Sequence, residues 1–261
     1  KNILITSILL VCFIAMNILQ FVHISFNSDS QISNIIKDSA FRFFGGTIFL
    51  FIIYYSRYNI LNPIKRPFLK SLLLVIPALL ISINNFPFVA FFTGNTELTK
   101  PVYTVFLFLI ACLSVGFFEE IIFRGVILLF FLQKFPNTRK GIILSIIVSA
   151  IFFGLMHSLN LLTGANVGQT LLQIGYSFIL GIMWAIILIK TKNIWLVVIL
   201  HAIYNFAGLL FPTLGSITLT NDFLTILITS ILALGVSIYM LNLLFSIEPK
   251  EIEQLYLPIK N

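Results

Sequence analysis

The stretch that decides the fold is VYTVFLFLIACLSVGFFEEIIFRGVILLFFL, residues 102–132. It is apolar almost throughout, and its only charged residues are Glu119, Glu120 and Arg124. A helix that crosses a bilayer needs about 20 mostly apolar residues. This stretch is long enough, so it predicts a membrane helix with ionisable groups inside its apolar length.

The composition of the whole chain agrees with that interpretation. Of the 261 residues, 59% are hydrophobic and 10% are charged, whereas a soluble domain has about 45–50% apolar and 25% charged residues. A soluble domain and a disordered segment are therefore excluded. The net charge of +7 comes from Lys and Arg at the ends of apolar runs, so no nucleic-acid partner is expected. The predicted fold class is all-α: a polytopic transmembrane helical bundle in contact with the lipid bilayer.

Eight apolar runs are expected to be the spans: residues 3–22, 43–55, 68–83, 102–132, 141–160, 171–189, 194–210 and 223–245. Lys and Arg are concentrated in alternate loops, which by the positive-inside rule predicts both termini in the cytoplasm. Residues 1–261 are expected to form one transmembrane domain. Residues 246–261 are expected to be a polar, solvated cytoplasmic tail.

Ionisable residues inside the spans are the first candidates for function. A charge at the bilayer centre costs about 2.5–3.5 kcal/mol on insertion scales, so such residues are retained when they pair or work. Glu120 and Arg124 are four residues apart and share a helix face, which predicts an ion pair. Glu119 is rotated by about 100° from Glu120 and can point into a different space.

Two histidines lie in later spans. Phe153 and His157 share a face of one helix, and His201 and Asn205 share a face of another. Counted from the intervening turn, His157 lies near the depth of Glu119. His201 is about nine residues past Lys192, or about 13 Å along its helix, which is shallower unless that span is tilted or kinked. A carboxylate, two histidines and an amide on three spans favour a working site over packing alone.

Three segments resemble a known family of membrane proteases. They are EEIIFR (residues 119–124), FGLMH (153–157) and HAIYN (201–205). In this order they are similar to the motifs EExxxR, FxxxH and HxxxN of the CAAX protease and bacteriocin-processing family, also called CPBP or Abi. The resemblance covers about residues 102–210, which we take as the catalytic core, and it implies an intramembrane endopeptidase.

The resemblance also implies roles for these residues. Glu119 would be the general base that activates water, and His157 would help to hold that water. His201 and Asn205 would stabilise the oxyanion. Glu120, Arg124 and Phe153 would support them.

The question of a metal stays open from the sequence. The resemblance favours a metal-free, glutamate-activated water, and the zinc run HExxH is absent. Zinc is the alternative cofactor, with Glu119, His157 and His201 as its ligands, because two histidines and a glutamate form a known catalytic zinc set.

Other functions are also compatible with the pattern. The main alternative is a non-catalytic membrane immunity or regulatory protein that binds a peptide or a sensor kinase. A proton- or ion-coupled transporter would use similar buried groups, but no internal repeat is visible. Ser177 lacks the second glycine of a rhomboid-like serine motif.

The expected substrate is a peptide or a membrane-protein segment. A composition rich in Ile, Lys, Asn and Phe suggests a bacterial cell membrane, with roles in bacteriocin self-immunity or peptide pheromone processing. The sequence does not specify the scissile bond or the oligomeric state.

Overall fold

The computed structural model describes residues 29–61, 68–219 and 222–256. Its α-helices are α2 (Ser30–Tyr55), α3 (Phe68–Asn84), α4 (Phe88–Phe92), α5 (Tyr103–Ile122), α6 (Leu129–Lys134), α7 (Arg139–Met156), α8 (Val167–Thr191), α9 (Ile194–Leu214), α10 (Phe223–Phe245) and α11 (Pro249–Glu253). A π-helical segment, η1 (Phe123–Leu128), joins α5 to α6, and a 3₁₀ helix, η2 (His157–Thr163), follows α7. The expected span at residues 3–22 lies outside the described residues.

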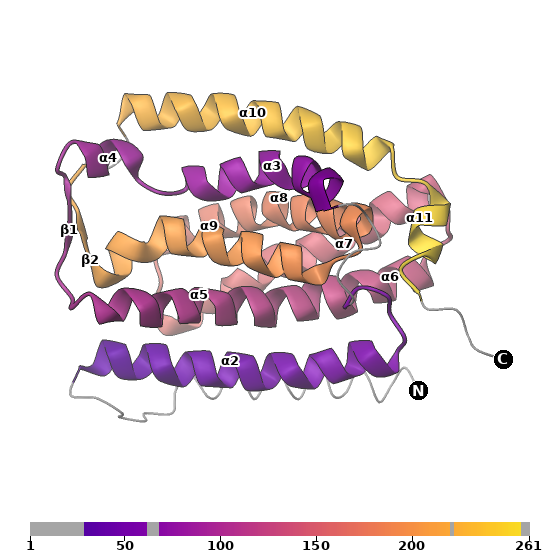
Figure 1. The fold of residues 1–261 in the computed structure, drawn as a ribbon, viewed down its shortest axis with the longest axis horizontal. Coiled ribbons are helices and arrows are strands. Elements are labelled where there is room, and N and C mark those ends of the chain that lie inside the picture. Colours follow the sequence, from indigo (N-terminus) through magenta and orange to yellow (C-terminus); the bar gives the residue numbers. More distant parts are fainter. Residues whose placement is uncertain (1–28, 62–67, 220–221, 257–261) are drawn as a thin grey trace.

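The long helices lie side by side along one axis. Figure 1 shows α2, α5, α9, α3 and α10 in that order across the bundle, with α7 and α8 behind them. This order brings α5 and α9, which are far apart in sequence, into the middle of the bundle. The predicted all-α architecture is therefore confirmed for the described part of the chain.

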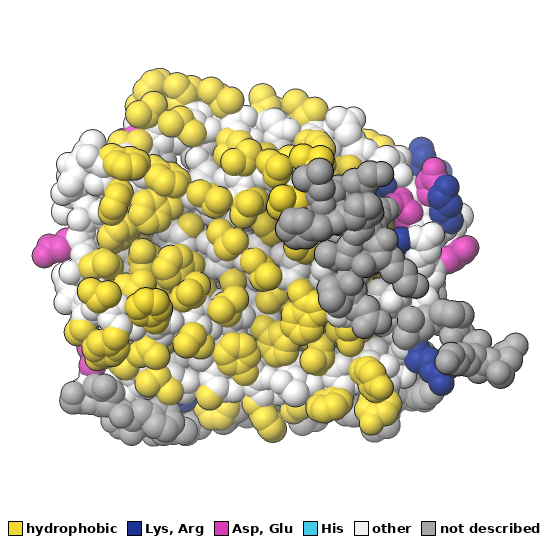
Figure 2. Space-filling view, in the orientation of Figure 1, with side chains coloured by type: hydrophobic (Ala, Val, Ile, Leu, Met, Phe, Trp, Pro, Cys, Tyr) yellow, Lys and Arg dark blue, Asp and Glu magenta, His cyan; other side chains and the backbone are white. Residues whose placement is uncertain are grey.

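Among the residues that the structure describes, five helical stretches are long and apolar enough to cross a membrane: Tyr103–Lys134, Arg139–Thr163, Val167–Thr191, Ile194–Leu214 and Phe223–Phe245. Figure 2 shows a broad hydrophobic face, with most of its visible charged side chains near the ends of the long axis. These features indicate a multi-pass membrane protein. The count of eight spans and the cytoplasmic location of both termini stay predictions.

The helix that holds the expected span at residues 43–55 starts earlier than the hydropathy indicated. α2 begins at Ser30 because the Asp29 side chain caps it, accepting hydrogen bonds from the backbone N–H groups of Gln31 and Ile32. Such an N-cap satisfies donors that the first helical turn leaves free. The first half of α2 is therefore a polar helix, with consequences for the cavity described below.

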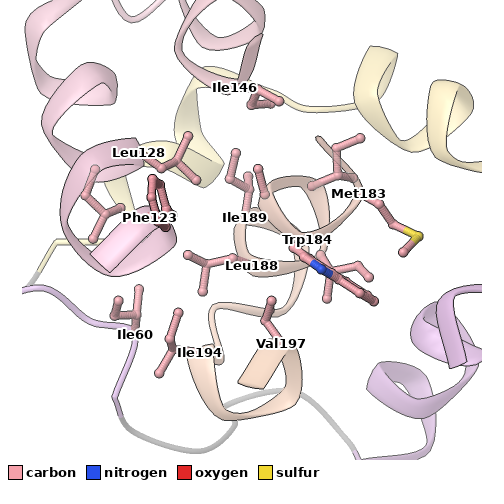
Figure 3. Packing of buried hydrophobic residues seen from close by; sticks show 14 of the residues in the cluster. Ile60, Phe123, Leu128, Ile146, Met183, Trp184, Leu188, Ile189, Ile194 and Val197 are labelled. Carbon is pink, nitrogen blue, oxygen red and sulfur yellow. The ribbon is translucent and has the colours of Figure 1, made fainter. Parts of the chain in front are cut away.

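The C-terminal half of α8 occupies the centre of the bundle. Every residue from Met183 to Thr191 is buried, and a helix that is apolar on all sides belongs in a core. Figure 3 shows Trp184, Leu188 and Ile189 among side chains from neighbouring elements. By contrast, α10 exposes apolar side chains along most of its length, as expected of a helix that faces lipid.

A short antiparallel ribbon was not expected from the sequence. β1 (Thr96–Leu98) pairs with β2 (Gly215–Ile217), with Thr96 opposite Ile217 and Leu98 opposite Gly215. A Cβ at Gly215 would lie 1.8 Å from the carbonyl oxygen of Glu97, so only glycine permits this approach. The ribbon ties the loop before α5 to the end of α9.

The segment expected to be a solvated tail packs in part on the bundle over residues 246–256, while most of its polar side chains stay exposed. Ile247, Ile252 and Leu255 are buried, and α11 packs against the end of α8. The Lys190 ammonium donates to Glu251 at 2.8 Å and to the backbone carbonyl of Ser246 at 3.0 Å. Isolated apolar residues among charged ones give no helical stripe long enough to recognise, which is why the sequence pattern indicated solvation. Residues 257–261 lie outside the described part.

Candidate active site

The two glutamates lie at the end of α5, where the helix changes its winding. α5, η1 and α6 form one continuous helical stretch of 32 residues, and η1 begins three residues after Glu120. π-Helical turns are rare and frequently occur at functional sites. The hydroxyl of Ser149 on α7 donates to the carbonyl oxygen of Phe123 at 3.1 Å, so a neighbouring helix satisfies a backbone acceptor at this irregularity.

Glu120 is the centre of a buried ionic network. Arg124 Nε lies 3.1 Å from Glu120 Oε2, which confirms the predicted pair. His201 Nδ1 lies 2.7 Å from Glu120 Oε1, and because an ionised carboxylate only accepts hydrogen bonds, Nδ1 is the donor. All three residues are buried, with exposed fractions of 0% for Glu120, 1% for Arg124 and 6% for His201. Burial makes charges costly unless they are paired, and here each carboxylate oxygen faces a cationic or donor group.

Glu119 has a different environment from its neighbour. Its side chain is 23% exposed, and its Oε2 lies 3.8 Å from His201 Nε2, beyond hydrogen-bond distance. Oε2 is a buried atom without a hydrogen-bond partner among the described residues. The imidazole of His201 therefore lies between the two glutamates, with Nδ1 bound to Glu120 and Nε2 directed toward Glu119.

A close approach of α5 and α9 produces this arrangement. A Cβ at Gly116 would lie 2.6 Å from the carbonyl oxygen of Val198 and 3.2 Å from the backbone nitrogen of Ala202. Gly116 is three residues before Glu119, and Ala202 follows His201 directly. The missing side chain lets the two backbones meet next to the site, which brings the Glu119–Glu120 pair within reach of His201.

Phe153 packs among the polar groups. The guanidinium carbon of Arg124 lies 4.2 Å from the centroid of the Phe153 ring. The same ring lies 5.5 Å from the ring of His157 and 6.0 Å from that of His201, in edge-on geometry. Stacking of a cation on an aromatic face is favourable where water is excluded. Phe153 thus connects α7 to the network on α5 and α9.

His157 lies at the junction of α7 and η2 and is partly buried. No hydrogen bond or ion pair joins it to another site residue within residues 29–61, 68–219 and 222–256. The structure therefore brings His157 beside Phe153 without a direct polar contact to Glu119.

His201 is deeper than a count from Lys192 suggested. Its direct bond to Glu120 puts the two residues at one level. The count assumed that the turn between α8 and α9 lies at the water surface, but Thr191, Asn193 and Ile194 are buried. The packed C-terminal segment covers that end of the bundle, so Lys192 does not mark the end of the folded structure.

Trp184 is a neighbour of the site that no sequence motif indicated. Its ring is fully buried and stacks on that of His201, with centroids 6.4 Å apart and planes 19° apart. A tryptophan within an apolar run reads as a packing or lipid-facing residue. Its place beside His201 follows only from how α8 packs.

Asn205 lies one helical turn beyond His201 and makes no hydrogen bond within the described part of the chain. It lines a cavity of about 400 Å³ between α2, α5 and α9. Six of the predicted residues are thus linked through Glu120, His201 and Phe153, whereas Asn205 lies apart from them on the side of α2.

The alternative metal set is not assembled. Among the residues that the structure describes, no three His, Cys, Asp or Glu side chains are arranged to hold a metal ion. His201 Nδ1 is bonded to Glu120, which leaves Nε2 as the ring nitrogen open to a ligand. The described residues nevertheless do not gather Glu119, His157 and His201 into a zinc site.

Comparison with protein families identifies the segment that holds the site. Residues 101–207 match the family described as type II CAAX prenyl endopeptidase Rce1-like. These residues form a domain of that family. The family is one of peptide hydrolases, and its match includes all seven predicted site residues. Neither the search of curated proteins nor that of solved structures gave a match.

Proposed function

We propose that this protein is an intramembrane endopeptidase that hydrolyses a peptide bond in a membrane-associated peptide or protein, with Glu119 as the general base. The observation that carries the proposal is the contrast between the adjacent glutamates. Glu120 is fully buried, ion-paired with Arg124 and hydrogen-bonded to His201, whereas Glu119 is partly exposed and its carboxylate makes no hydrogen bond with the described residues. A base must have a lone pair available for the proton that it removes.

The remaining residues support the other needs of amide hydrolysis. Water attack on a carbonyl creates an oxyanion, and a donor aimed at it contributes about 2.7–4 kcal/mol. His201 can donate through Nε2 when that atom carries a proton, while Glu120 fixes the orientation of the ring through Nδ1. Asn205 is the second proposed donor. His157 is proposed to hold the attacking water from the side of α7.

In this proposal no metal takes part. Glu119 activates the water without a metal. Metal analysis of the purified protein tests this point. We expect less than stoichiometric zinc, and zinc at one equivalent that is lost together with activity on chelation would contradict the metal-free mechanism.

The proposed setting is a bacterial cell membrane, with a role in bacteriocin self-immunity or peptide pheromone processing. The decisive experiment compares membrane and secreted peptides from cells that carry the wild type or Glu119→Gln at equal expression. We expect defined peptide termini to vanish in the variant while a precursor accumulates. Mass spectrometry of the termini would also reveal the substrate.

The competing function is a non-catalytic immunity or regulatory protein that binds a peptide or a sensor kinase. It predicts that Glu119→Gln leaves the peptide profile unchanged and still rescues the phenotype of a gene deletion. That result would overturn the catalytic proposal. A matched variant, Glu97→Gln in the exposed strand β1, controls for the loss of a carboxylate elsewhere.

A further inference from the structure

The cavity beside Asn205 has a polar wall that the proposed chemistry does not use. Its volume is about 400 Å³, and it lies between the first half of α2 and the facing parts of α5 and α9. The lining residues that matter here are Asn34, Asp38, Arg42, Cys112, Val115 and Asn205. Asn34, Asp38 and Arg42 are four residues apart on α2, so they form one stripe along the cavity wall.

The cavity ends close to the proposed site. Val115 precedes Glu119 by four residues on α5, and Asn205 follows His201 by four residues on α9. Four residues of α-helix rise about 6 Å. A molecule that fills the cavity would therefore extend to within about one helical turn of Glu119 and His201.

The two charged residues on the polar wall, Asp38 and Arg42, differ in their partners. Asp38 has a cation nearby, since Lys37 Nζ lies 3.6 Å from its Oδ1. Arg42 makes no hydrogen bond or ion pair with any of the described residues. A cation without a partner at the edge of an apolar core is costly, and such residues in membrane proteins are associated with ligand or ion pathways.

We propose that this cavity binds a carboxylate-bearing segment of the peptide substrate, and that Arg42 binds the carboxylate. The planar guanidinium matches a carboxylate with two parallel hydrogen bonds. The proposal rests on the peptidase function and adds the kind of substrate: a chain with an acidic group near its cleavage site, rather than a wholly apolar membrane helix. A peptide is favoured over an anionic lipid because the cavity leads to Asn205 and because Asp38 faces the same space.

The thiol of Cys112 offers a test that requires no known substrate. The chain has two cysteines, so Cys12→Ser leaves Cys112 as the single thiol of the full-length protein. In detergent, its labelling rate is measured with an anionic and a cationic methanethiosulfonate of similar size. We expect the anionic reagent to be favoured, and Arg42→Gln to lower the anionic-to-cationic rate ratio about tenfold, as expected for a charge that concentrates ions in a cleft.

Two controls make the labelling result specific. Arg139→Gln removes an exposed arginine at the turn between α6 and α7 and is expected to leave the ratio unchanged. Val115→Cys in a chain without Cys12 and Cys112 gives a second reporter on the cavity wall. If neither thiol reacts, or if Arg42→Gln and Arg139→Gln change the ratio equally, the proposal is wrong.

Protection by synthetic peptides tests the ligand class and its source. In the Glu119→Gln background, labelling is measured with acetyl-tetraalanine as the free acid, its C-terminal amide, and an amidated acetyl-pentapeptide with a central glutamate among alanines. Protection by the free acid alone assigns a terminal carboxylate, and protection by the glutamate peptide assigns a side-chain carboxylate. Both kinds of protection should disappear in the Arg42→Gln variant. Equal protection by the neutral amide would overturn the proposal.

A lipid ligand has a separate signature. If phosphatidylglycerol nanodiscs protect Cys112 without peptide while phosphatidylcholine nanodiscs do not, the cavity is a lipid site and the proposal fails. The result of this labelling experiment does not depend on whether the protein is a peptidase. Loss of peptide products in Glu119→Gln with no effect of Arg42→Gln on labelling refutes only this inference, whereas unchanged products in Glu119→Gln refute the proposed function.

Discussion

Glu119 and Glu120 are neighbours in the chain, but they belong to two different regions of the molecule. Glu120 lies in a sealed region with Arg124, His201, Phe153 and Trp184, where each side chain is buried. Glu119 belongs to an open region with His157, where both side chains are partly exposed and make few polar contacts. Two identical side chains can therefore have different chemical roles.

Because adjacent residues of a helix are rotated by about 100°, the two glutamates face different surroundings. One glutamate can therefore support the structure while the other takes part in the chemistry. A buried carboxylate that is paired with a cation and a histidine orients those partners and is closed to water and substrate, so its lone pairs are not available for a reaction. A partly exposed carboxylate keeps a lone pair that can accept a proton. The sealed region should therefore respond to substitution mainly through stability, and the open region mainly through activity.

Arg124→Leu should give the largest loss of stability. It leaves the Glu120 carboxylate buried without its cation, and breaking a buried pair costs about 3–5 kcal/mol. We expect that loss in the free energy of unfolding, measured by denaturation in detergent micelles. Glu119→Gln, in the open region, should change the unfolding free energy by less than about 0.5 kcal/mol while lowering the hydrolysis rate by about 10²–10⁴-fold.

The double variant Glu120→Leu with Arg124→Leu sharpens this prediction. Replacing a buried ion pair by apolar side chains is often neutral for stability, so the double variant should recover much of what Arg124→Leu loses. Activity should stay low because His201 has lost the acceptor that orients it. Equal stability losses for Glu119→Gln and Arg124→Leu would remove the distinction between the two regions.

Gly116→Val should have an intermediate effect on the free energy of unfolding and on activity. The new Cβ would meet the carbonyl of Val198 at 2.6 Å, so α5 and α9 must move apart. Such overpacking costs about 1–3 kcal/mol, and the separation should also reduce activity because Glu119 and His201 lie on the two helices.

Gly235→Val on α10 is the matched control for that substitution. A Cβ at Gly235 meets nothing within 4 Å, so we expect a change of less than about 0.5 kcal/mol and unaltered activity. If both valine variants were equally stable and active, the close approach of α5 and α9 would not position the site.

The smallest expected effect on activity comes from a substitution at the N-terminus of α2, next to the cavity. The ion pair of Lys100 with Asp29, at 2.5 Å, and two backbone N–H groups lower the pKa of Asp29 below its usual 3.8. The stabilisation from this lowered pKa is complete above pH 3.8 and is lost as the pH falls through the lower folded value.

Lys100→Gln should raise the pKa of Asp29 toward its usual value, and Lys100→Arg should largely preserve the lowered value. Carboxyl carbon chemical shifts of labelled aspartate, followed from pH 7 to pH 2, measure the change. Hydrolysis at neutral pH should be nearly unaffected, since the pair lies apart from Glu119. An unchanged pKa in Lys100→Gln would show that the backbone N–H groups alone hold it low.

The sequence was sufficient for the class of protein and for the ion pair at the centre of the candidate site. Apolar runs of about 20 residues have few alternatives to membrane helices, and the start and end of α10 agree with its run. Helical spacing also predicted the Glu120–Arg124 pair, because residues four apart on one helix must share a face. Three motifs at fixed spacing indicated the family, and the family match to residues 101–207 confirmed it.

Tertiary structure decided what spacing within single helices cannot encode. The depth of His201 depends on the C-terminal segment that buries the turn between α8 and α9, and the place of Trp184 depends on how α8 packs. The division of Glu119 from Glu120 depends on which neighbouring helix each face meets, and Asn205 is separated from His201 by one helical turn along α9, where α2 forms the opposite wall. Local sequence sets the direction of a side chain on its own helix, whereas contacts between distant helices set its surroundings and therefore its chemistry.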